Sequence, residues 1–341
     1  MPFQIIRNDI ANMRADAIVN TANPKPVIGA GTDAAIHKKA GSGLLAARQK
    51  IGVINTGCAA ITPAYNLGAK YVIHTVGPVW EGGNRGEEAL LRSCYENSLK
   101  LAYKQGCQSI AFPLISTGTY GFPKDRALQI AISVFSTFLL EQDMHISLVV
   151  YDRTSFQLSE KLFQGVSSFI DENYVTTQEF AAYGWEKEKR RNCQYEREIC
   201  RSDTFEPPRP CASMAASKPL SLKDILRQED AGFTETLLKR IDQTGKKDSE
   251  IYKKANLSKQ HFSKIRNNPH YKPTKATAIA LALALELNLE ETKDLIGRAG
   301  YALTNSSKFD LIIRYFIENH NYNVIEINVT LYEFDQPLLG A

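Results

Sequence analysis

The sequence predicts an α/β protein, in which a mixed β-sheet is covered by helices and is followed by a mostly helical second domain. Three observations support this. Up to about residue 175, short apolar runs alternate with helix-like segments. The pattern fails between about residues 176 and 218, and helical periods then return. The length of 341 residues also suits two domains.

Six short runs in the first segment are rich in β-branched or aromatic residues, as strands are. Between them, Glu87–Gln105 and Lys124–Glu141 place apolar residues along one helical face. The predicted strands are Phe3–Ile6, Ala17–Asn20, Ala59–Thr62, Tyr71–Val76, Ser109–Pro113 and Ile146–Tyr151.

These patterns divide the chain into four parts. Residues 1–175 form the α/β domain, and residues 176–218 form a charged linker that contains several prolines. Residues 219–305 form the helical domain. Residues 306–341 form a tail with a helix and a strand, since apolar and polar residues alternate over Tyr322–Phe334.

Boundary signals support helices in the second domain. Thr234 precedes a glutamate and suits a helix start, Gly245 suits a helix end, and Ser258 suits the start of a short helix. The longest apolar run, Ala276–Leu287, is too short to span a bilayer and predicts a buried helix.

Composition excludes several classes of protein. The opening residues lack the pattern of a signal peptide, so a cytoplasmic protein with no membrane partner is expected. The six cysteines show neither a disulfide framework nor zinc-ligand spacing, so no metal is expected. The net charge of +4 permits a polyanionic partner without requiring one.

Two glycine-containing loops follow predicted strands. The first runs from Thr21 to Asp33 and leads into a helix, and the second covers Ile115–Pro123. Glycine lets the backbone approach a ligand closely, and the N–H groups at a helix N-terminus attract phosphate oxygens. Two such loops at strand ends predict a clamp for a diphosphate.

Three polar residues of the first loop region stand out. An ordinary connection between strand and helix requires neither Asn20 nor Asn23. Asp33 lies beside the predicted phosphate site, where its charge is unfavourable, although it would also serve as a helix N-cap. These residues are therefore candidates for polar or catalytic roles.

Six motifs occur in order along residues 1–175. They are Asn8–Ile10, Asp16–Pro24, Gly31–His37, Ala60–Thr62, Val72–Trp80 and Ser116–Pro123. Taken together, these motifs resemble those of MacroD-type macrodomains. The resemblance implies a three-layer α/β/α sandwich that binds ADP-ribose. It also implies a hydrolase that removes mono-ADP-ribose from acidic side chains of proteins or deacetylates O-acetyl-ADP-ribose.

The same resemblance assigns site residues. Asn23 would orient the distal ribose and Asp33 would position or activate the attacking water, with no metal or cofactor required. Asp9 and Ile10 would contact adenine, and Tyr151 would stack on it, although a core tyrosine remains an alternative. The other predicted ligand-binding residues are Asn20, Gly29, Ala30, Gly31, Thr32, Ser116, Thr117, Gly118, Thr119 and Tyr120. His37 and His74 receive no catalytic role.

The first loop departs from the pattern of that family. Ile28 and Ala30 stand where two of four consecutive glycines are usual, and Thr32 replaces the usual valine. A side chain at a position that requires positive φ would be strained, and a larger side chain would narrow the distal-ribose pocket.

The second domain resembles DNA-binding domains of the phage-repressor type, from about residue 233 to 300. Asp248–Ala255, a turn, and Ser258–Asn267 have helix-turn-helix spacing. The predicted DNA contacts on the second helix are Lys259, Gln260, Ser263, Lys264 and Arg266. Two alternatives remain open. One is a solvated helical face whose lysines keep the domain soluble, and the other is a helical module that docks a protein.

Three functions remain open. The first is a hydrolase that the C-terminal domain localises to a partner or to nucleic acid. The second is a non-catalytic reader of ADP-ribose or a related nucleotide, coupled to a DNA- or protein-binding domain. The third is a ligand-responsive DNA-binding regulator, which would need oligomer symmetry to match a palindromic site.

Overall fold

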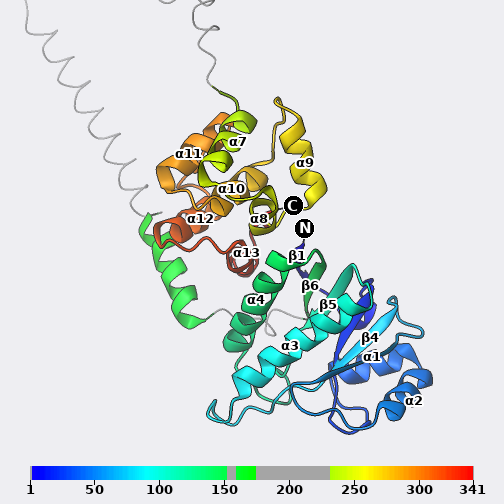
Figure 1. Cartoon of the computed structure of the whole chain (residues 1–341). Coiled ribbons are helices and arrows are strands. Elements are labelled where there is room, and N and C mark those ends of the chain that lie inside the picture. The colour runs from blue at the N-terminus through cyan, green and yellow to red at the C-terminus, as the bar shows by residue number, and fades with distance from the viewer. Residues whose placement is uncertain (1, 152–158, 174–230, 341) are drawn as a thin grey trace, which may run out of the picture.

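The computed structural model describes residues 2–151, 159–173 and 231–340 (Figure 1). Its N-terminal part is a six-stranded sheet in the order β1-β6-β5-β2-β4-β3. All neighbouring strands are parallel except β3, which runs antiparallel to β4. The mixed sheet and all six predicted strands are confirmed. The strands are β1 (Phe3–Arg7), β2 (Ala17–Thr21), β3 (Ala59–Pro63), β4 (Tyr71–Thr75), β5 (Ser109–Pro113) and β6 (His145–Val150).

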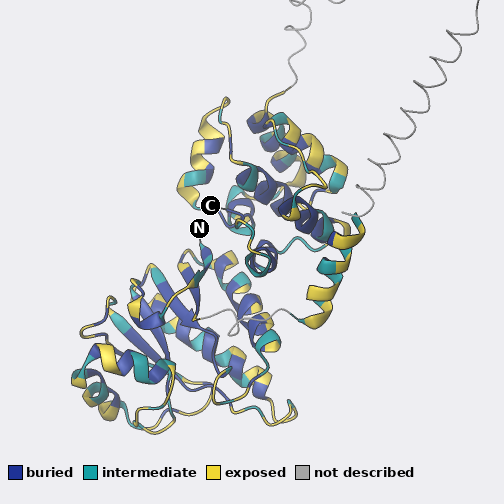
Figure 2. Ribbon diagram, turned by 180° about the vertical axis from the view of Figure 1, so that it is seen from behind, coloured by how far each residue is buried: buried dark blue, intermediate teal, exposed yellow. Residues whose placement is uncertain are grey.

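Helices cover both faces of the sheet, because alternate strand residues point to opposite sides. Val19 of β2 joins a core with Tyr95 and Phe135, whereas the adjacent Ile18 joins a core with Ile36. Helices α3 (Glu87–Lys104) and α4 (Lys124–Glu141) contribute to the first core. Helices α1 (Thr32–Ala40) and α2 (Ser42–Ile51) contribute to the second. The sheet between them is buried (Figure 2), and the three-layer fold is confirmed.

The second domain is helical, as predicted. Helix α10 is its centre, since residues 277–284 are all buried, in agreement with the buried helix expected there. The helices are α7 (Phe233–Thr244), α8 (Asp248–Lys254), α9 (Lys259–Asn267), α10 (Lys275–Ala284), α11 (Leu289–Arg298), α12 (Lys308–Glu318) and α13 (Val324–Glu333).

Two of the three predicted boundary signals hold. Gly245 ends α7 with a φ of 66°, and the Ser258 hydroxyl accepts a hydrogen bond from the His261 N–H at the start of α9. Thr234 is not an N-cap: α7 is preceded by Gly232, and the buried Thr234 hydroxyl donates to the carbonyl of Asn268. Tertiary packing therefore overrides the local signal at this position.

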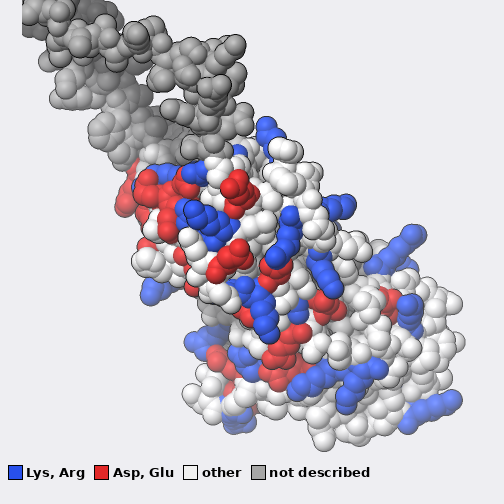
Figure 3. Space-filling model, turned by 45° about the horizontal axis from the view of Figure 1, so that its top comes forward, with Lys and Arg blue, Asp and Glu red and all other residues white. Residues whose placement is uncertain are grey.

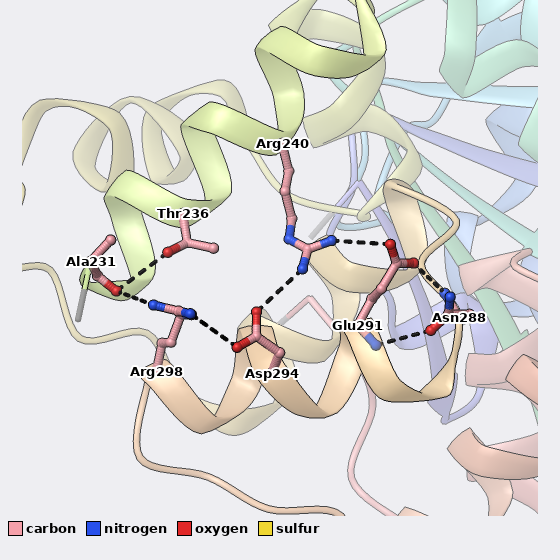
Figure 4. Close-up of polar contacts among 7 residues, drawn as sticks. All are labelled: Ala231, Thr236, Arg240, Asn288, Glu291, Asp294 and Arg298. Carbon is pink, nitrogen blue, oxygen red and sulfur yellow. Dashed lines mark hydrogen bonds and ion pairs between the residues drawn. The ribbon is translucent and has the colours of Figure 1, made fainter.

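Ionic contacts join α7 to α11 (Figure 4). Arg240 of α7 contacts both Glu291 and Asp294, and Asp294 also pairs with Arg298. The hydrogen bond from Arg298 is the largest of the effects that lower the pKa of Asp294. Asn288 and Glu291 form a capping box at the start of α11. These contacts connect α11 to α7 at a partly exposed surface.

The strand predicted over residues 322–334 is wrong, because this segment is helix α13 with Asn323 as its N-cap. The helix contributes to two cores at once. Val324, Ile327 and Leu331 pack into the core of the helical domain, whereas Ile325 and Val329 pack into the α/β core. A helix that is buried on two sides has apolar residues on both faces. In the sequence, the apolar residues of the two faces alternate with polar ones, and this resembles the pattern of a strand.

A further helix, residues 160–173, packs against the helical domain near the C-terminal end of α13. Its Val166 and Ile170 lie in the core of the helical domain, and the ring of Phe163 stacks on that of Phe334, with centroids 5.3 Å apart. The chain therefore joins the second core before residue 175, where the sequence placed the domain boundary. The predicted linker, residues 176–218, lies outside the described residues.

Asn256 lies at the junction of the two domains, in the turn between α8 and α9. Its side chain accepts a hydrogen bond from the Phe3 N–H at 2.8 Å and donates to the Phe3 carbonyl at 3.0 Å. Nearby, Lys253 of α8 donates to the carbonyl of Leu140 and pairs with Asp143. The helical domain therefore covers the first residue of edge strand β1.

No helix within the described parts of the chain has both the length and the apolar character needed to cross a bilayer.

Candidate functional site

A cleft of about 650 Å³ lies at the carboxyl ends of β2, β5 and β6. This is the edge at which the sequence placed both loops. The cleft is lined by every predicted site residue of the first domain except Asn20. These residues are Asp9, Ile10, Asn23, Gly29, Ala30, Gly31, Thr32, Asp33, Ser116, Thr117, Gly118, Thr119, Tyr120 and Tyr151.

The first loop turns at Gly31, which has a φ of 61°, and α1 begins at the next residue. The N–H groups of this helix start therefore face a site suited to an anion. Neither Ile28 nor Ala30 has positive φ, so the strain considered for these two positions is absent. A Cβ at Gly29 would lie 2.9 Å from the Asn23 Nδ2, so a larger residue there would displace the Asn23 side chain.

The second loop turns at Ser116, which has a φ of 65°. The Ser116 hydroxyl is buried and has no hydrogen-bond partner within the described residues. A Cβ at Gly77 would lie only 2.0 Å from this oxygen. The Tyr120 hydroxyl reaches the Asn23 Oδ1 at 3.5 Å and so connects the two loops. An unsatisfied hydroxyl in the cleft wall is a ready hydrogen-bond partner for a ligand.

Asp33 is held on both carboxylate oxygens. Its Oδ1 accepts from the Asn20 Nδ2 at 2.6 Å, and its Oδ2 accepts from the Gly29 N–H at 2.5 Å. His37 Nε2 lies 3.5 Å from the same Oδ1. Asp33 is 2% exposed and occupies the first turn of α1, whereas Gly31 is the N-cap. The N-cap role considered for Asp33 is therefore wrong, and its carboxylate is fixed at the cleft.

Asn20 does not line the cleft. It is fully buried in β2, and its Nδ2 donates to Asp33 and lies 3.2 Å from the His74 Nδ1. The prediction that it binds ligand directly is corrected by this geometry, because the strand directs its side chain beneath Asp33. Asn20 supports a site residue instead of contacting a ligand.

Arg48 of α2 holds the first loop in place by hydrogen bonds to its backbone. Its guanidinium donates to the carbonyls of Asn23, Pro24 and Gly52. Burial lowers the pKa of Arg48 and the charge of Asp33 opposes that shift. Arg48 was not predicted from the sequence, since only the fold brings α2 beneath the loop.

At the other end of the cleft, Asp9 is the N-cap of the short 3₁₀ helix Ile10–Asn12. Its Oδ1 accepts from the Ala11 N–H at 2.9 Å. Tyr151 is 73% exposed, so the alternative of a core tyrosine is excluded. The cleft is also lined by Lys124, a cation that was not predicted although it follows the second loop directly.

A second candidate surface lies on α9. The five predicted DNA-contacting residues are exposed. Phe262 and Ile265, on the opposite face of the helix, are buried. Arg266 pairs with Asp248 of α8, which reduces its availability. Lysine and arginine side chains are interspersed with acidic ones on the face shown in Figure 3.

No group of three potential metal ligands occurs among the described residues. Cys58, Cys94 and Cys107 are free thiols.

The layered fold and the cleft between two glycine-containing loops define an α/β domain of the macrodomain class. The Macro domain family model matches residues 19–131. A macro domain-containing protein of Methanosarcina mazei is 48% identical over 161 residues, which cover 47% of this chain and 86% of that protein. The chain therefore belongs to the macro domain family.

Another relative is named as an O-acetyl-ADP-ribose deacetylase, from Cronobacter turicensis. It is 46% identical over 166 residues, which cover 47% of this chain and 94% of that protein. Among solved structures, a macrodomain of Oceanobacillus iheyensis with MES bound is 37% identical. The match covers 45% of this chain and 85% of that one, with a TM-score of 0.44.

Proposed function

We propose that this chain binds ADP-ribose and hydrolyses an ester at its distal ribose. The substrate would be O-acetyl-ADP-ribose or a protein carrying mono-ADP-ribose on an acidic side chain. The observation that carries this proposal is the Asp33 carboxylate, which two donors fix beside a cleft with two phosphate-suited loops. The name of the Cronobacter relative supports the first substrate.

The geometry suggests a division of roles. The N-terminus of α1 and the Ser116–Tyr120 loop would hold the diphosphate. Asn23 would orient the distal ribose, and Asp33 would accept a proton from the attacking water. The water oxygen bonds to the acyl carbon, the bond from that carbon to the ribose oxygen breaks, and the ribose oxygen takes up the proton. Acid and ribose hydroxyl are the products.

The test uses the purified full chain with O-acetyl-ADP-ribose and with a protein mono-ADP-ribosylated on glutamate. We expect release of acetate or of free ADP-ribose, measured by chromatography and mass spectrometry, and calorimetric binding of ADP-ribose. Binding without release from either substrate would overturn the hydrolase and favour a reader. No binding would overturn both.

We further propose duplex DNA as a second ligand, bound by the helical domain. Helices α8 and α9 are separated by a four-residue turn, residues 255–258, and α9 presents a polar, exposed face. The helical domain contacts Phe3 at the start of β1, whereas the cleft lies at the opposite ends of the strands. Both ligands would therefore bind at the same time.

Replacing Lys259 and Lys264 together with alanine is expected to weaken duplex binding. The slope of the logarithm of the binding constant against the logarithm of the salt concentration should become shallower by about one unit for each phosphate that the variant no longer neutralises. Fluorescence anisotropy over a range of salt concentrations measures both quantities. Lys308→Ala is the control, because this exposed lysine lies on α12. Equal binding by all three proteins, or none by wild type, would contradict the assignment.

A further inference from the structure

A chain of buried polar side chains leads from the far edge of the sheet to the candidate catalytic carboxylate. Thr62 Oγ1 of β3 lies 3.0 Å from the His74 Nε2 of β4. His74 Nδ1 lies 3.2 Å from the Asn20 Nδ2 of β2, which is 2.6 Å from the Asp33 Oδ1. All four side chains are buried. The chain thus spans three strands and the first turn of α1.

Hydrogen-bond chemistry fixes the direction of each contact. The carboxylate of Asp33 accepts, so Asn20 must direct its NH₂ group toward it. The second hydrogen of that group then points to the His74 Nδ1, which must be unprotonated to accept it. His74 consequently carries its proton on Nε2 and donates it to Thr62 Oγ1.

The surroundings of His74 agree with a neutral ring. Burial, together with the nearby charges of Arg48 and His37, lowers the pKa of His74 to about 3. The ring is therefore neutral at physiological pH, and its contacts with Asn20 and Thr62 decide which tautomer it adopts. His74 is directly paired with Asn20 in the parallel register of β2 and β4, so the backbone of the sheet also fixes their relative position.

We propose that His74 is a positioning residue, which holds the amide of Asn20 in the orientation that aims the Asp33 carboxylate at the reacting water. This inference rests on the proposed hydrolysis. Without the acceptor at Nδ1, the Asn20 amide keeps only one of the two hydrogen bonds that set its rotation. Asp33 then keeps the Gly29 N–H on Oδ2 and the His37 contact at 3.5 Å on Oδ1, but the Asn20 amide, which makes the shorter contact with Oδ1, becomes free to rotate.

The test compares His74→Phe, which keeps a ring and removes the acceptor, with His74→Asn, whose amide oxygen can replace Nδ1. We expect kcat for the substrate that wild type hydrolyses to fall by about 10-fold to 100-fold in His74→Phe, since small misplacements of reacting groups cost this much. KM and the calorimetric Kd for ADP-ribose should change less than about twofold, because His74 does not line the cleft. His74→Asn should recover most of the kcat.

Two further measurements separate positioning from folding. Thr75→Val is a matched control, because the buried Thr75 hydroxyl on the same strand bonds the Cys58 carbonyl and takes no part in the chain. It should leave kcat close to that of wild type even if the melting temperature falls. Nitrogen NMR should find the His74 proton on Nε2.

Several outcomes would overturn the inference. The first is a His74→Phe variant that keeps the wild-type kcat. The second is an equal loss of kcat in His74→Asn and His74→Phe. The third is a His74 ring that carries its proton on Nδ1. If wild type hydrolyses neither substrate, the proposed function fails first, and the positioning role fails with it. Wild-type turnover combined with an active His74→Phe variant rejects only the positioning role.

Discussion

Replacing Asp33 with alanine is expected to lower kcat for hydrolysis by about 10²- to 10⁴-fold, the usual contribution of a general base. The cleft should remain after this change, because Asp33 contributes only one of the many side chains and backbone segments that line it. The Kd for ADP-ribose should therefore change far less than kcat. Stopped assays with the acylated substrate and calorimetry with ADP-ribose measure the two effects.

Asp125→Ala is the matched control for this prediction. Asp125 also lies in the first turn of a helix that begins beside the cleft, but it does not line the cleft. It should keep wild-type kcat. An Asp33→Ala variant with more than half of wild-type kcat would show that another group activates the water. A variant that loses turnover and ADP-ribose binding equally would show that Asp33 binds ligand instead.

Replacing Asn256 with alanine is expected to reduce the free energy of unfolding by about 2–5 kcal/mol, since each buried polar group left unsatisfied costs about 1–3 kcal/mol. The change removes two hydrogen bonds at once and leaves the N–H and carbonyl of Phe3 without them at the domain junction. Asn256 is 2% exposed, so water cannot readily replace its side chain. Urea denaturation of the full chain measures the loss.

Backbone conformation gives a control for the Asn256 prediction. The φ of Asn256 is 55°, which favours glycine over alanine by about 1–2 kcal/mol. Asn256→Gly should therefore be less destabilised than Asn256→Ala, although it also loses both hydrogen bonds. Asn319→Ala, which removes an exposed side-chain hydrogen bond to the Tyr315 carbonyl, should be nearly neutral. A wild-type urea midpoint in Asn256→Ala would mean that the junction does not contribute to stability.

The two predictions concern opposite ends of the sheet. Asn256 holds the first residue of β1, whereas the same strand leads into Asp9 at the adenine end of the proposed site. The helical domain is thus built onto the strand without covering the cleft. The residues that line the cleft all belong to the first domain, and α9 remains exposed on the other.

Much of the candidate site was predictable because most of its residues lie in two short loops, each with a recognisable local pattern. Each glycine-containing loop follows a strand, and the carboxyl ends of neighbouring parallel strands meet at one edge of a sheet. The sequence therefore places Asn23 and Asp33 opposite Ser116 before the fold is known. Supporting residues such as Arg48 and His74 carried no such signal, because their partners are distant in sequence.

The amino-acid sequence alone was enough to predict the strands β1 to β6 and helices α3 and α4, because these follow from side-chain periodicity. It was also enough to predict the position of both loops, because glycine and other turn residues mark them. Tertiary structure decided the rest. Only the packing of two cores against α13 shows why Val324–Glu333 is a helix. Only the sheet brings Asn20 beneath Asp33. Periodicity reports that a residue is buried, but the identity of its neighbours comes from contacts between segments far apart in the chain.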